Sequence, residues 1–153
     1  HFFAPPRYMH LLELIPTPET DAEVLDAVRR FGERILGKGI VICKDAPGFI
    51  ANRLGVHGMV RTLHAKDAHG LTIDEVDALT GPLLGRPKSA TFRTGDLSGL
   101  DVLLHVTNGL AQTTGEDFAL PAWFHEMVRA KRLGMGTPAG RVTRTRATWG
   151  GEW

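Results

Sequence analysis

The sequence has little of several features that would assign it to a class at once. It holds a single cysteine, Cys43, so no disulfide can form within the chain, and this suits a cytoplasmic protein. Its 18 basic and 17 acidic residues nearly cancel, to a net charge of +1, which argues against a general role in binding nucleic acid or membranes. No apolar run approaches the roughly 20 residues of a membrane span. With 42% hydrophobic residues in 153, the chain can still bury a sizeable core.

Metal-binding patterns are scarce as well. His57 and His64 could share one face of a helix, but two histidines without a carboxylate make a poor site, so we expect no metal. The strongest local charge is a basic stretch at residues 129–146, which contains no acidic residue. A CoA or nucleic-acid phosphate could bind there, although a solvated helix end followed by a loose tail is the better interpretation.

The first part of the chain alternates between strand and helix. Leu11–Ile15 and Ile40–Cys43 are short apolar runs typical of buried strands, and apolar residues recur at helical spacing over Asp21–Leu36. This order predicts a βαβ unit with parallel strands. Thr20 to Glu23 has the spacing of a capping box, which marks the start of the helix.

After residue 45 the pattern is helical. Pro47 and Gly48 interrupt the second strand, and we expect Asp45 to cap a long helix over residues 49–69. Further helices are predicted after a second capping box at residues 72–75, on both sides of Gly99, and after Pro121. We therefore expect three parts: residues 1–45, a helical domain over 46–133, and a poorly ordered tail over 134–153.

Glu13 interrupts the first apolar strand, where a buried charge is costly unless it is paired. It could be an edge residue facing water, or it could pair with His1, because two adjacent parallel strands would bring these residues within reach. An imidazole takes up a proton near neutral pH, and a carboxylate on its other nitrogen fixes its tautomer. Asn52, about one turn into the long helix, could contact a ligand at the seam between the two domains, although a surface amide is the simpler interpretation.

Several stretches together resemble one family. His1–Pro6 (HFFAPP), Leu11–Ile15 (LLELI) and Lys44–Arg53 (KDAPGFIANR) resemble L-3-hydroxyacyl-CoA dehydrogenase, and so do Gly85–Lys88 and Asp96–Asp101. The resemblance implies a mainly α protein, in which a short βαβ remnant of a Rossmann-type NAD-binding domain precedes an all-α C-terminal domain. It also implies that His1 is the catalytic base, that Glu13 orients it, and that Asn52 binds the substrate.

The resemblance further implies a reaction, a cofactor and a partner. The reaction is the NAD-dependent oxidation of 3-hydroxyacyl-CoA to 3-ketoacyl-CoA in fatty-acid β-oxidation, by a homodimer. The family's glycine-rich NAD loop is absent from this sequence, and the chain opens on what reads as a strand already under way. We therefore expect a fragment that is inactive without its nucleotide-binding domain. Ala4 also stands where the family usually has asparagine.

One alternative function remains open at this point. The chain could be a catalytically silent helical module kept for dimerisation or for binding acyl-CoA. In either case we expect a dimer, because the helical part carries more apolar residues than one small core requires: Phe49, Met59, Trp123, Phe124 and Met127.

Overall fold

The computed structural model describes residues 1–135, which belong to two compact units. The first unit is residues 1–53 and the second begins at Leu54. Most of the expected tail, from residue 136 onward, lies outside the described residues. No helix within residues 1–135 is long and apolar enough to cross a membrane.

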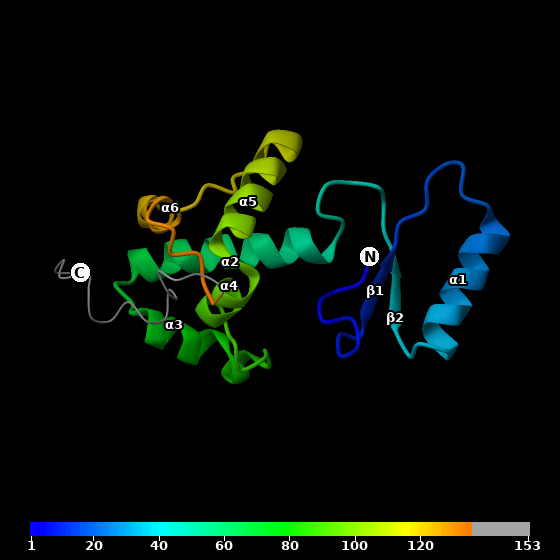
Figure 1. Cartoon of the computed structure of the whole chain (residues 1–153), viewed down its shortest axis with the longest axis horizontal. Helices are drawn as coiled ribbons and strands as arrows, with labels where there is room; N and C mark the ends of the chain where they lie inside the picture. The colour runs from blue at the N-terminus through cyan, green and yellow to red at the C-terminus, as the bar shows by residue number, and fades with distance from the viewer. Residues whose placement is uncertain (136–153) are drawn as a thin grey trace. The chain divides into compact units, whose positions relative to one another are not determined.

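The first unit is a βαβ arrangement. Strands β1 (Leu11–Leu14) and β2 (Gly39–Ile42) pair in parallel, with helix α1 (Ala22–Arg34) connecting them, which confirms the predicted order (Figure 1). Gly32 permits the helix to approach the strands closely, because a Cβ at this position would lie 2.6 Å from Cδ1 of Ile40.

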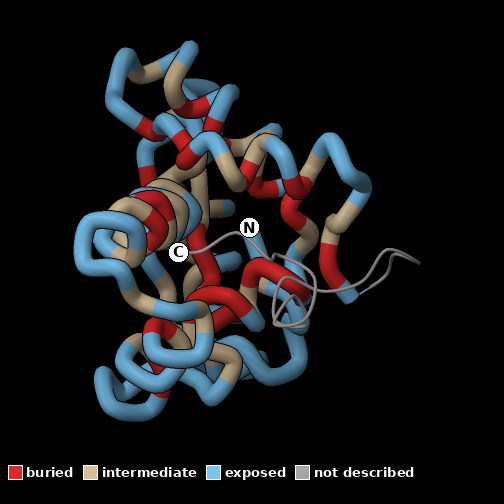
Figure 2. The backbone as a smooth tube through the Cα atoms, turned by 90° about the vertical axis from the view of Figure 1, so that its left-hand side faces the viewer, coloured by how far each residue is buried: buried red, intermediate tan, exposed pale blue. Residues whose placement is uncertain are grey.

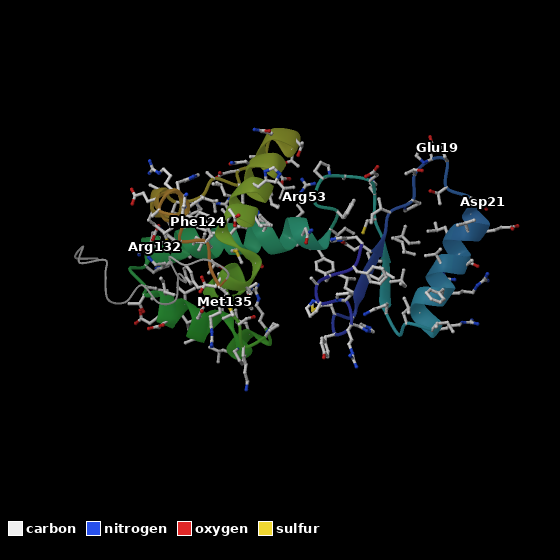
Figure 3. All side chains as sticks on the ribbon, in the orientation of Figure 1. Glu19, Asp21, Arg53, Phe124, Arg132 and Met135 are labelled. Carbon is white, nitrogen blue, oxygen red and sulfur yellow. The ribbon has the colours of Figure 1, made fainter. Side chains whose placement is uncertain are left out.

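The start of α1 differs from the prediction. The N-cap is Asp21, which is labelled at the start of α1 in Figure 3. Its side chain accepts a hydrogen bond from Glu23 N at 2.7 Å. Thr20 instead accepts from Thr17 N at 2.9 Å and closes the turn before the helix. The capping box expected at Thr20 is therefore wrong, because the threonine is occupied in that turn and the short carboxylate beside it reaches the first helical amides.

The N-terminal segment runs antiparallel to β1, and the expectation of parallel strands here is wrong. Phe2 forms an isolated antiparallel bridge with Leu12, and His1 and Glu13 exchange both backbone hydrogen bonds, at 3.1 and 2.8 Å. Residues 4–10 are the whole connection, and a parallel crossover needs a dozen or more residues. A connection this short can only return the chain antiparallel.

Helix α2 (Ala51–Ala68) begins later than expected. Gly48 and Phe49 both adopt positive φ angles, +73° and +46°, which no helix can continue through, so a turn precedes the helix. Asp45 lies before this turn and does not reach the helix start as an N-cap. The expectation for Asp45 is therefore wrong.

The second unit is entirely helical among its described residues. After α2, which crosses from the first unit into the second, the chain forms α3 (Ile73–Thr80), a short 3-10 helix η1 (Pro82–Leu84), α4 (Phe92–Ser98), α5 (Leu100–Thr114) and α6 (Ala122–Arg129). These confirm the helices predicted after residue 72, around Gly99 and after Pro121. The capping box at Thr72 and Glu75 is present as predicted, and Gly99, with φ +92°, separates α4 from α5.

The core of the second unit is built by these helices. Figure 2 shows that buried positions alternate with exposed ones along the backbone. Phe124 and Met127 are buried at 2% and 5% exposure, and Met59 and Trp123 pack against the same cluster. These residues were expected to be surplus to one core, and that reason for a dimer is wrong. The exposed apolar side chains of this unit are others: Leu54, Leu79, Leu83, Leu84, Leu97, Val102 and Met135.

Candidate active site

The structure brings His1 and Glu13 together within the first unit. Nδ1 of His1 lies 2.8 Å from Oε2 of Glu13. The Glu13 side chain is fully buried, at 0% exposure, whereas the His1 side chain is 29% exposed. The chain start lies beside β1 (Figure 1). The antiparallel pairing places His1 and Glu13 directly opposite one another. The alternative that Glu13 faces water is therefore excluded.

The other carboxylate oxygen of Glu13 receives three donors. Oε1 accepts from Ile50 N at 3.1 Å and from Ala51 N at 2.9 Å, and Cys43 Sγ lies 3.5 Å away. The residue that caps the start of α2 is thus a glutamate of β1. Because an ionised carboxylate is an acceptor only, four donors around its two oxygens fit the ionised form.

Cys43 follows β2 and is buried, at 4% exposure, as expected for a small apolar residue. Burial raises the pKa of its thiol, and the hydrogen bond to Glu13 and the negative charge there act in the same direction. The thiol therefore stays protonated and donates to the carboxylate. This contact was not foreseen from the sequence.

The orientation of the imidazole follows from its neighbours. Since an ionised carboxylate can only accept, Nδ1 of His1 donates to Glu13, and in the neutral imidazole Nε2 then carries the free electron pair. The ring packs edge-on against Phe3, with centroids 4.9 Å apart, and tilted against Phe49 at 5.4 Å. An exposed imidazole held in one tautomer is suited to take a proton from a hydroxyl.

Asn52 is the second residue of α2 rather than a residue one turn in. Its side chain is exposed, and within the described part of the chain no hydrogen bond joins it to His1 or Glu13. It follows Ala51, whose amide binds Glu13, so it is close in sequence to the pair. The structure thus brings together two of the three predicted site residues, and adds Cys43 and Phe49 to them.

Residues 1–135 contain a pair of groups suited to proton transfer, His1 and Glu13, but no glycine-rich loop that would bind a dinucleotide phosphate at the start of α1. Within residues 1–135 there is no group of three or more metal-ligating side chains. The turn before α1, residues 17–21, contains no glycine, and Asp21 and Glu23 place negative charge where a pyrophosphate would bind. Within residues 1–135, the groups at His1 and Glu13 are therefore suited to proton transfer, and we assign none of the described residues to dinucleotide phosphates.

Within the first unit, the buried carboxylate of Glu13 on β1 holds the imidazole of His1, an arrangement that is chemically suited to proton transfer. The comparisons specify the class further. Residues 1–46 match the family model of the 3-hydroxyacyl-CoA dehydrogenase NAD binding domain, and residues 48–144 match that of its C-terminal domain. The chain belongs to the 3-hydroxyacyl-CoA dehydrogenase family.

Individual relatives agree with this assignment. The chain is 51% identical over 148 residues to a probable 3-hydroxyacyl-CoA dehydrogenase of Deinococcus radiodurans, covering 95% of this chain and 43% of that protein. A protein of the same description from Bacillus subtilis is 46% identical, covering 88% and 18%. The solved structure of M. tuberculosis FadB2 is similar with a TM-score of 0.78 and 31% identity, covering 88% of this chain and 47% of that one. The chain therefore spans less than half the length of these relatives.

Proposed function

We propose that the whole protein oxidises a 3-hydroxyacyl-CoA to the 3-ketoacyl-CoA. Nε2 of His1 takes the proton of the 3-hydroxyl, the hydrogen on C3 leaves with its electron pair as hydride, and the carbon–oxygen bond becomes a ketone. NAD, when bound, supplies the hydride acceptor. Glu13 keeps the imidazole in the tautomer that can accept the proton and stabilises the imidazolium that forms.

The observation that carries this proposal is the 2.8 Å contact between Nδ1 of His1 and the fully buried carboxylate of Glu13. A carboxylate without solvent contact needs a partner to compensate its burial, and here that partner is the exposed base. We assign substrate binding to Asn52, whose exposed amide has no hydrogen bond of its own within residues 1–135.

The names of relatives support the substrate class. A 31% identical protein of Mycobacterium tuberculosis is named 3-hydroxybutyryl-CoA dehydrogenase, and a 40% identical protein of Rickettsia prowazekii is named a putative fatty acid oxidation complex trifunctional enzyme. We propose by analogy that this protein acts on acyl-CoA thioesters in fatty-acid β-oxidation, in the cytoplasm.

The test is an oxidation assay on the protein at the length of its relatives. We expect NADH to form when a 3-hydroxyacyl-CoA and NAD are both supplied. We expect His1→Asn, which is close in shape but cannot act as a base, to abolish this signal while circular dichroism remains unchanged. A well-folded wild-type protein that forms no NADH with short, medium or long acyl chains would overturn the proposal.

We also propose that the protein is a homodimer joined through the helical unit. The support is its exposed apolar side chains, since Leu83 is 73% exposed and Leu97 is 62% exposed. Exposed apolar side chains indicate association where they form one contiguous patch, and the dimer proposal requires that Leu83 and Leu97 belong to such a patch. The same feature favours the second candidate function, a silent dimerisation module, and the oxidation assay separates the two.

A further inference from the structure

The turn between β2 and α2 contains an unusual backbone conformation. Phe49 adopts φ +46°, in the left-handed region that a bulky residue avoids, because its Cβ crowds the neighbouring carbonyl there. The glycine before it, with φ +73°, adopts this region freely. A phenylalanine remains in such a conformation only where its surroundings hold it.

The side chain of Phe49 contacts the candidate base. Its ring centroid lies 5.4 Å from that of the His1 imidazole, with an angle of 54° between the planes. Phe3 also contacts the imidazole, but it belongs to the same short segment as His1 and moves with it. Phe49 is therefore the aromatic contact that ties the imidazole to another element of the unit.

The backbone that follows Phe49 contacts the other member of the pair. The amides of Ile50 and Ala51 both donate to Oε1 of Glu13, at 3.1 and 2.9 Å. Two successive amides can converge on one oxygen because the left-handed residue before them turns the chain into the first turn of α2. One residue thus acts on both partners, through its ring on His1 and through its backbone on Glu13.

We propose that Phe49 is a positioning residue that fixes the His1 imidazole and the Glu13 carboxylate relative to each other. Its ring sets the plane of the imidazole, so that Nδ1 stays on Oε2 of Glu13 and Nε2 faces the substrate. Its backbone holds Oε1, so that the carboxylate cannot rotate away from the imidazole. This inference rests on the proposed function, because it concerns the base of that reaction.

The test compares three variants of the protein at the length of its relatives. Phe49→Tyr keeps the ring, Phe49→Leu keeps apolar bulk without the ring, and Phe49→Gly removes the ring and accepts the left-handed backbone. We expect kcat to fall about 10- to 100-fold in the leucine and glycine variants, as for a slightly misplaced catalytic group, with KM changed less than about twofold. The tyrosine variant should recover wild-type kcat. Phe31→Leu, a half-exposed phenylalanine on α1, is the matched control.

A second readout does not depend on turnover. The nitrogen NMR signals of the His1 imidazole report which nitrogen carries the proton. We expect one tautomer, protonated at Nδ1, in wild type and in Phe49→Tyr, and a mixture in Phe49→Leu. If the protein proves to have no dehydrogenase activity, this spectrum still decides the positioning role. A single Nδ1 tautomer in Phe49→Leu, or wild-type kcat in that variant, would overturn the inference.

Discussion

Replacing Glu13 by glutamine tests the core of the proposed site, because it keeps the size of the side chain and changes only what its two terminal atoms can do. Oε1 now accepts from Ile50 N and Ala51 N and lies 3.5 Å from the Cys43 thiol. An amide NH2 in that place would face two backbone N–H groups. The glutamine must therefore put its carbonyl oxygen there and its NH2 at the position of Oε2.

This orientation determines the tautomer of His1. The NH2 would lie where Oε2 now meets Nδ1 at 2.8 Å, and because it can only donate, Nδ1 must become the acceptor. The proton then moves to Nε2, the nitrogen that should receive the proton of the substrate. The geometry survives, whereas the base is lost.

The expected loss is large. An amide at the equivalent place in a serine hydrolase lowers turnover about 10⁴-fold through the same tautomer error, so we expect about 10³- to 10⁴-fold here. At about 1.4 kcal/mol per factor of ten, this corresponds to about 4–5.5 kcal/mol of transition-state stabilisation. KM should change little, because Glu13 is fully buried and does not meet the substrate.

The measurement is kcat and KM for 3-hydroxyacyl-CoA oxidation by the protein at the length of its relatives, together with the imidazole tautomer by nitrogen NMR. Glu19→Gln, an exposed glutamate in the turn before α1, is the matched control and should behave as wild type (Figure 3). Near-wild-type turnover in Glu13→Gln would refute the role given to the carboxylate. So would an Nδ1-protonated imidazole in the variant.

Three further predictions concern Asn52, Cys43 and the association state. Asn52→Ala should lower kcat/KM by an amount equivalent to about 1–3 kcal/mol of transition-state binding. The control Asn108→Ala, at an exposed position of α5, should leave kcat/KM unchanged. Equal effects of the two variants would contradict a role of Asn52 in substrate binding. Because burial raises the pKa of the Cys43 thiol, the folded chain keeps this proton at a pH at which the unfolded chain has lost it. The free energy of unfolding, measured with urea, should therefore decline as the pH rises above the thiol pKa of the unfolded chain, about 8.5. Cys43→Ala should lack that decline, and an identical pH profile in the variant would contradict the assignment. Light scattering at about 10–50 µM should show a dimer. The double variant Leu83→Glu/Leu97→Glu should weaken this dimer, whereas Val24→Glu on α1 should not. A monomeric wild-type protein would count against the helical interface.

Much of the fold could be predicted because its signals are local. Apolar spacing indicated the helices, the capping box at Thr72 marked the start of α3, and a glycine with φ +92° separates α4 from α5 where the sequence placed the break. The βαβ order could be predicted in the same way, because apolar residues recur with a different spacing in strands and in helices. These features depend on a few neighbouring residues and not on the rest of the chain.

The errors arose where distant residues decide a local conformation. Asp45 had the position of a helix cap, but the carboxylate that reaches the start of α2 comes from Glu13, 37 positions away from Ile50. The positive φ of Phe49 likewise could not be predicted from its residue type, because a phenylalanine side chain favours negative φ angles. The pairing of Glu13 could be predicted, since a charge within an apolar strand requires a partner, whereas its second contact with α2 could not.

Glu13 therefore contributes to both the fold and the site, and the two contributions use different oxygens. Oε1 caps the first turn of α2, and Oε2 holds the imidazole of His1. The amides of Ile50 and Ala51 reach Oε1 only when the turn containing Phe49 has formed. The imidazole of His1 reaches Oε2 only when residues 1–3 pair with β1. Because one buried carboxylate joins both events, the base acquires its tautomer only in the folded unit. Any change that frees Oε1 from α2 should therefore also loosen the hold of Oε2 on Nδ1, and with it the tautomer that leaves Nε2 free to accept a proton.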